Sequence, residues 1–183
     1  MNTEINSNAT GVKRPFKLEE IWRIRTRLEI KNNLMQLVLL NLAIDSKLRS
    51  CDLLSLRVRD VATTDHIFER VQWTQKKTGT EVQFEITPRT QQSISRWVQN
   101  KVLQPNDYLF FSLRRANQPI SYSYYSSIIR NWAVQLGLDS DLYGTHSMRR
   151  TKATLVSKFQ EKPIVSSTRS LFLLPLFQFD SRS

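Results

Sequence analysis

The chain has 183 residues, 40% of them hydrophobic, and 27 lysines and arginines against 16 acidic residues give a net charge of +11. This length fits one ordinary hydrophobic core and is too short for two full domains. The basic excess is shared by the early, middle and late parts of the sequence, which favours a phosphate-binding surface over a single basic tail and argues against a small neutral ligand. A basic protein without any nucleic-acid role is the alternative that charge alone leaves open.

The first third of the chain predicts helices. Residues 1–16 lack the apolar core of a signal peptide, so we expect a flexible polar arm and a cytoplasmic protein. Apolar residues recur at helical spacing in 18–30, whereas 34–44 is apolar on nearly every side. The second segment is too short to cross a bilayer and predicts a helix at the centre of the core. Residues 48–56 predict a short helix, followed by a strand at 57–61.

A β-hairpin is predicted in the middle of the chain. Residues 67–75 and 80–87 alternate between polar and apolar side chains and are rich in β-forming residues. The sequence KKTG between them supplies a turn and places Lys76 and Lys77 at its tip. On that stretch alone, two solvated lysines that aid solubility are the simpler interpretation.

The later elements complete a mainly helical pattern. Thr87 and Pro88 suit the N-cap and first position of a helix that continues through 89–101. Residues 108–113 predict a short buried strand or extended segment, and 122–136 predict another helix. The expected fold class is mainly α with a small antiparallel β-sheet (α+β).

The cysteine and histidine content bears on the chemistry. Cys51 has no partner for an internal disulfide, and His66 and His146 lie too far apart for zinc-ligand spacing. We therefore expect no metal and no cofactor, and we interpret His66 as a surface residue of a loop. The tryptophans fall at apolar-periodic or strand positions and are expected in the core rather than as base-stacking platforms: Trp22, Trp73, Trp97 and Trp132.

The segment GTHSMRRTKAT carries the second histidine close to two arginines. If a helix starts at His146, Arg149 and Arg150 are its i+3 and i+4 neighbours on one face. An imidazole and guanidinium groups on one face suit a phosphate ligand. Taken alone, the segment is more simply interpreted as the first turn of a helix with a satisfied histidine and a solvated basic face.

Four residues together suggest phosphodiester chemistry: Arg49, Lys77, His146 and Arg149. A phosphodiester under nucleophilic attack gathers negative charge on its non-bridging oxygens, which bidentate guanidinium groups match in geometry. A leaving sugar oxygen also needs a proton, and a lysine on a hairpin is a suitable general acid. Arg49 could instead be a salt-bridge partner of Asp52 or Asp45.

These motifs resemble those of the tyrosine recombinases, or phage-type integrases. DSKLRSCDLLSLRVRDV is similar to the first arginine box, with Arg49 at the catalytic position and Asp52 at the usual acidic position. QKKTGTEVQF resembles the hairpin of the catalytic lysine, Lys77, and GTHSMRRTKAT resembles the H-x-x-R box with His146 and Arg149. The resemblance implies double-stranded DNA as partner, with both arginines clamping the scissile phosphate, and no role in catalysis is expected for Arg150.

The resemblance stops before the family's nucleophilic tyrosine. The last tyrosine of the chain is Tyr143, and none follows Arg149. Residues 156–183 also lose the helical period, so we expect a catalytic-like domain at 17–155 and a divergent tail. A frameshifted gene, an ordinary divergent C-terminus and a tyrosine supplied in trans by another subunit all remain open explanations.

Two functions follow from this pattern. The first is a site-specific DNA recombinase or integrase that is an incomplete copy, inactive alone without the tyrosine. The second is a non-catalytic DNA-binding remnant that occupies sites or interferes with an intact recombinase, either as a homo-oligomer or together with that relative.

Overall fold

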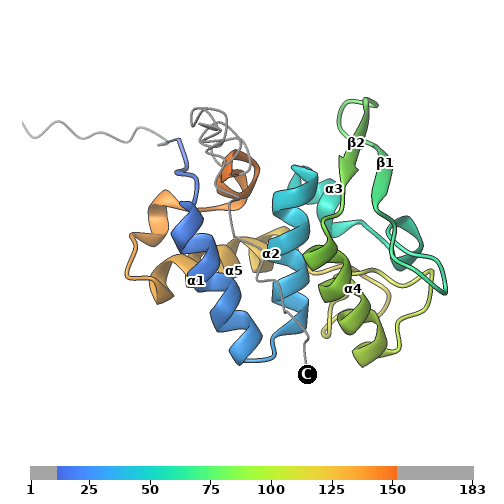
Figure 1. The fold of residues 1–183 in the computed structure, drawn as a ribbon. Helices are drawn as coiled ribbons and strands as arrows, with labels where there is room; N and C mark the ends of the chain where they lie inside the picture. The colour runs from blue at the N-terminus through green and yellow to red at the C-terminus, as the bar shows by residue number, and fades with distance from the viewer. Residues whose placement is uncertain (1–11, 152–183) are drawn as a thin grey trace, which may run out of the picture.

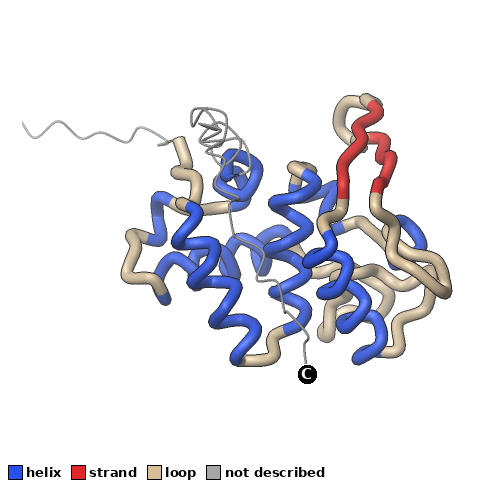
Figure 2. The backbone as a smooth tube through the Cα atoms, viewed as in Figure 1, coloured by secondary structure: helices blue, strands red, loops and turns tan. Residues whose placement is uncertain are grey.

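The computed structural model describes residues 12–151 (Figure 1). Helices dominate, and one hairpin projects from the helical body (Figures 1 and 2). In chain order, the elements are α1 (Leu18–Ile30), α2 (Leu34–Ser46), α3 (Ser50–Leu54), the 3₁₀ turn η1 (Val58–Asp60), β1 (Arg70–Thr74), β2 (Glu81–Glu85), α4 (Pro88–Lys101), α5 (Tyr122–Gln135) and the 3₁₀ turn η2 (Ser140–Leu142). Residues 145–151 are also helical. The predicted class, mainly α with a small antiparallel sheet, is confirmed.

The helix α2 lies at the centre of the core, as its uniformly apolar sequence predicts. Leu39, Leu40 and Leu42 point to different sides of the helix and are all fully buried, and each contributes about 1.5–3 kcal/mol by leaving water. Polar contacts fix its neighbours, because the buried Asn41 accepts from Arg25 Nε of α1 at 2.9 Å and donates to Ser93 Oγ of α4 at 3.3 Å. α2 therefore joins α1 to α4. No helix within residues 12–151 is long and apolar enough to span a membrane.

The hairpin has one buried face and one solvated face. β1 and β2 pair antiparallel, with Val71 opposite Phe84, and both of these side chains are buried. Arg70 and Glu85 form an exposed ion pair at 2.9 Å. The strands are shorter than predicted, since the ladder covers 70–74 and 81–85.

Two predicted strands do not form ladders. Residues 57–61 contain the 3₁₀ turn η1 in place of a strand, because Asp60 Oδ2 accepts from the Arg57 N–H at 2.7 Å and tightens the chain. Residues 108–113 are interrupted by a turn at 109–110 and make only isolated bridges, one of them between Tyr108 and Arg57. Alternation and β-forming residues could not reveal the absence of a continuous partner strand.

The four tryptophans differ in burial. Trp97 and Trp132 are buried, as expected, and Trp73 is half-buried. The prediction is wrong for Trp22, which is 45% exposed. Its position is apolar-periodic in α1, yet its ring is only partly covered, by the guanidinium groups of Arg25 and of Arg89 from α4.

The start of the described chain is fixed to its end. Phe16 is fully buried and its ring stacks on Tyr143 with 4.5 Å between centroids. The Phe16 N–H also donates to Thr151 Oγ1 at 3.1 Å. Phe16, the last residue of the predicted arm, thus belongs to the core. The predicted tail at 156–183 lies outside the described residues.

Candidate functional site

Arg49 occupies the N-cap of the short helix α3. Lys47 adopts a left-handed conformation with φ of 54° at the end of α2, and the chain turns sharply there. The buried Leu48 anchors this turn, and the half-buried Arg49 follows it. The Arg49 Nη1 atom is buried and has no hydrogen-bond acceptor among the described residues. A buried guanidinium donor without a partner is costly in a protein unless a ligand or solvent satisfies it.

Asp52 connects α3 to the hairpin turn. Its side chain is fully buried, and its Oδ1 atom accepts from the Lys76 backbone N–H at 2.9 Å. Its Oδ2 atom is buried without a hydrogen-bond partner in the described part of the chain. Asp52 and Arg49 form no ion pair with each other, so the alternative that Arg49 serves Asp52 as a salt-bridge partner is wrong. The carboxylate instead fixes where the lysine-bearing turn lies relative to α3.

Lys77 lies at the tip of the hairpin and is exposed. The turn is closed by the Thr78 and Gly79 N–H groups, which both donate to the Gln75 carbonyl, at 3.3 and 2.8 Å. Gly79 has a φ of +64°, a conformation that suits glycine. Because the turn backbone is bonded to Asp52 at Lys76, the base of the Lys77 side chain is held while its ammonium group reaches solvent.

The helical residues 145–151 present His146 and Arg149 away from the core. Ser147, Met148 and Thr151 are buried on the inner side, whereas His146 is exposed and Arg149 half-buried. The Ser147 hydroxyl accepts from the Gly144 N–H at 3.1 Å and fixes the first turn of this helix. The predicted helix and the shared i, i+3 face are thus present in the structure.

The predicted residues fall into two groups. Arg49 and Lys77 are connected through Asp52, whereas His146 and Arg149 share one later helix. In the view of Figure 1, that helix, the hairpin tip and the C-terminal end of α2 lie at the same edge of the molecule. The connecting role of Asp52 was not foreseen from the sequence, where its i+3 spacing from Arg49 suggested only an ion pair.

Tyrosine hydroxyls near this edge have distinct environments. Tyr143 is buried, and its pKa is raised by burial and by the nearby Glu20, while Arg14 opposes the shift. Tyr122 is 56% exposed at the start of α5, and its hydroxyl lies 3.2 Å from Thr145 Oγ1. Tyr143 therefore has a structural role, whereas Tyr122 supports the residue before His146.

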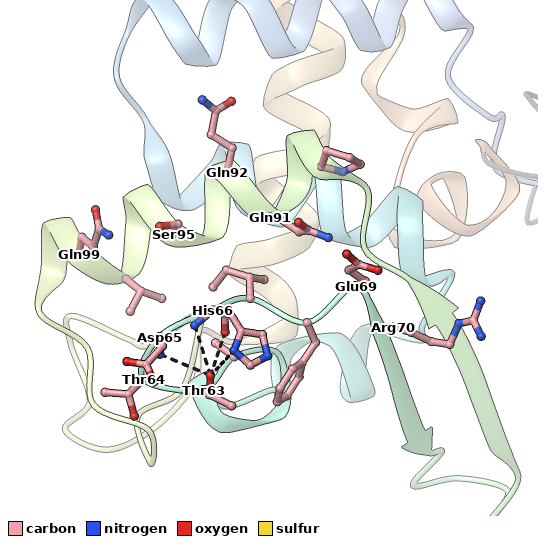
Figure 3. A pocket seen from close by; sticks show the side chains of 15 residues that line it. Thr63, Thr64, Asp65, His66, Glu69, Arg70, Gln91, Gln92, Ser95 and Gln99 are labelled. Atoms are coloured by element: carbon pink, nitrogen blue, oxygen red, sulfur yellow. Dashed lines mark hydrogen bonds between the residues drawn. The ribbon is translucent and has the colours of Figure 1, made fainter.

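A separate polar cavity of about 850 Å³ lies between residues 62–70 and α4 (Figure 3). None of the four predicted catalytic residues lines it. The exposed His66 on its wall has its Nδ1 atom 2.8 Å from Thr63 Oγ1, which confirms the surface-loop interpretation of His66. Among residues 12–151, no group of three or more histidine, cysteine, aspartate or glutamate side chains could hold a metal ion.

Comparisons with known proteins bear on this arrangement. The model of the phage integrase family matches residues 15–160. The chain belongs to the phage integrase family. It is also 34% identical over 134 residues to "Probable integrase/recombinase YoeC" of Bacillus subtilis (strain 168), an alignment that covers 73% of this chain and 68% of that protein.

Solved structures of recombinases share the fold. XerA recombinase superposes with a TM-score of 0.66 at 16% identity, covering 81% of this chain and 52% of XerA. The lambda integrase catalytic core has a TM-score of 0.59 at 17% identity, with 80% of this chain and 84% of that chain covered. The XerH recombinase bound to its difH substrate has a TM-score of 0.62 at 17% identity, covering 82% of this chain and 45% of XerH. The chain thus spans about half the length of XerA and XerH.

Proposed function

We propose that this family member binds double-stranded DNA and clamps a scissile phosphate for site-specific recombination or integration. The observation that supports this most is the hydrogen bond from the Lys76 N–H to Asp52, which joins the arginine helix to the lysine turn. The unpartnered Nη1 atom of Arg49 is a donor suited to a phosphate oxygen. Such a protein acts on DNA in the cytoplasm.

Each of the four residues has a role in this proposal. Arg49 and Arg149 neutralise the charge that develops on the non-bridging oxygens during nucleophilic attack. His146 donates to the same phosphate, and Lys77 gives a proton to the leaving sugar oxygen. The reaction uses no group beyond these side chains and a hydroxyl nucleophile.

The source of that nucleophile distinguishes two candidate functions. Tyr143, the last tyrosine of the chain, is buried against Phe16 and unsuited to attack. In the first function, an intact recombinase subunit supplies a tyrosine in trans to the clamp of this chain. In the second, the chain only binds DNA, occupies sites and interferes with such a relative.

Nicked suicide substrates test the two functions. We expect the chain alone to retard duplex DNA in a salt-sensitive way and to form no covalent adduct. In a second reaction, the chain is mixed with an intact relative in which alanine replaces the arginine that corresponds to Arg49. This relative supplies the tyrosine and the chain supplies the arginine, so an adduct forms only if the two proteins share a site. An adduct in the mixture supports the first function. The second function is supported if the mixture forms no adduct and if the chain also lowers adduct formation by the unmodified relative in a parallel reaction.

Arginine variants test the clamp itself. In the mixture, Arg149→Ala in this chain should abolish adduct formation, whereas Arg150→Ala on the same helix is a matched control with the same change of charge. Equal loss of adduct in both variants contradicts the assigned role of Arg149. Absence of any DNA retardation at moderate salt contradicts both functions.

A further inference from the structure

A cluster of one indole and two guanidinium groups lies outside the proposed clamp. The partly exposed ring of Trp22 on α1 has the Arg25 guanidinium carbon 5.1 Å from its centroid. The Arg89 guanidinium carbon, from α4, lies 4.5 Å from the same centroid. Both distances fall within the range in which a ring attracts a cation. We call Trp22, Arg25 and Arg89 the Trp22 cluster.

The Trp22 cluster is held in place by buried contacts. The Arg25 Nε atom donates to Asn41 Oδ1 at 2.9 Å, and the 1% exposed Asn41 also bonds Ser93 of α4. This bond uses one of the five N–H donors of Arg25. Moving Arg25 away would leave a buried amide oxygen unpaired, so its guanidinium group is ordered before any ligand arrives.

Both positive and negative side chains act on Arg25 in the cluster. The pKa of Arg25 is lowered by burial first and by the positive charge of Arg89 second. Glu29 and Asp45 act in the opposite direction, but with smaller effects. If the cluster served only to pack α1 against α4, an apolar pair would do so without this repulsion. Trp22 and Arg89 are both exposed, so an anionic ligand can reach the guanidinium group that lies over the indole.

The position of the cluster relates it to the proposed clamp. Asn41 lies five residues before the end of α2, which is roughly 8 Å along the helix axis, and Arg49 begins the next helix. Asp45 accepts from the Thr87 N–H and hydroxyl, both at 2.9 Å, two residues before Arg89. Phosphates on one DNA strand advance by about 3.4 Å per nucleotide along the duplex axis. A strand held at Arg49 would present further phosphates at this spacing, and α2 joins the cluster to the segment that carries Arg49.

We propose that the Trp22 cluster binds the DNA phosphate backbone a few nucleotides from the scissile phosphate, without reading sequence. Guanidinium groups match phosphate oxygens in a bidentate way, and the indole keeps both groups oriented. This inference rests on the proposed function, because it assumes that the chain binds duplex DNA. It adds a contact that positions the strand without taking part in the chemistry.

A salt series of DNA binding tests this inference. The full chain and its variants are titrated onto a labelled duplex, and the logarithm of the binding constant is plotted against the logarithm of salt concentration. Arg89→Ala should reduce the slope by about one and weaken binding equally on unrelated duplexes. Trp22→Ala should also reduce the slope, whereas Trp22→Phe keeps an aromatic face and should retain most of it.

Lys101→Ala is the matched control. Lys101 lies at the far end of α4, and its Nζ atom is 5.8 Å from the ring of Trp97, so the variant also removes one positive charge stacked on an indole. Its slope should equal that of the unmodified chain. If Arg89→Ala binds DNA normally, with an unchanged slope and an unchanged unfolding midpoint, this inference is overturned and the proposed function is not. An unmodified chain that binds no duplex overturns the proposed function as well.

Discussion

Replacement of Asp52 should release the lysine-bearing turn from α3. The fully buried carboxylate accepts one backbone N–H, that of Lys76, at 2.9 Å. A hydrogen bond to a charged group contributes about 1.5–3 kcal/mol. Asp52→Ala removes the acceptor and leaves a small cavity, so the local opening of the turn should become about 10- to 150-fold more populated.

Hydrogen exchange at the Lys76 amide measures this opening directly. Asp52→Asn retains an oxygen that can accept the bond, and it should accelerate exchange much less than Asp52→Ala. Asp60→Ala serves as control, because Asp60 also accepts a backbone N–H, from Arg57 at 2.7 Å, but does so in η1. The control should lower the free energy of unfolding without a selective effect on the Lys76 amide.

One result would refute the reasoning about Asp52. If Asp52→Ala accelerates exchange of the Lys76 amide no more than that of amides exchanging through global unfolding, the carboxylate does not hold the turn. A second readout is catalytic. In the mixed cleavage assay, Asp52→Ala should slow adduct formation through Lys77 while salt-dependent DNA binding stays unchanged.

Three further predictions concern the surroundings of the proposed clamp. Gly79→Ala should cost about 1–2 kcal/mol of turn stability, seen as faster exchange of the turn amides, because the φ of +64° disfavours a side chain even though no atom crowds the position. Tyr122→Phe should lower the free energy of unfolding by at most about 1 kcal/mol, because it removes the 3.2 Å contact with Thr145; an unchanged chemical shift at Thr145 would contradict this. Burial raises the pKa of Tyr143 in the folded chain, so the folded state keeps a proton that the unfolded state loses, and stability should fall as pH rises above about 10. Tyr143→Phe should flatten that fall in pH-dependent unfolding midpoints, and an equally steep fall in the variant would show that other groups cause it.

The main elements could be predicted because their signals are local. The uniformly apolar α2 has nowhere to lie except in the core, and the alternation around KKTG specifies a hairpin. By contrast, the strand expected at 57–61 is a 3₁₀ turn, because strand formation needs a partner along its length and Tyr108 provides only one bridge. Intrinsic preference cannot supply a missing neighbour.

The sequence by itself determined which chemical groups are present and in what order: the arginine box, the lysine turn and the H-x-x-R helix each depend on residues close together in the chain. Only the tertiary structure decided how distant groups meet. Asp52 bonds a backbone N–H 24 residues away, and Trp22 stays partly exposed between two arginines, one of them on α4. Periodicity shows which face of a helix is apolar, but the packing of other helices decides how much of that face is covered.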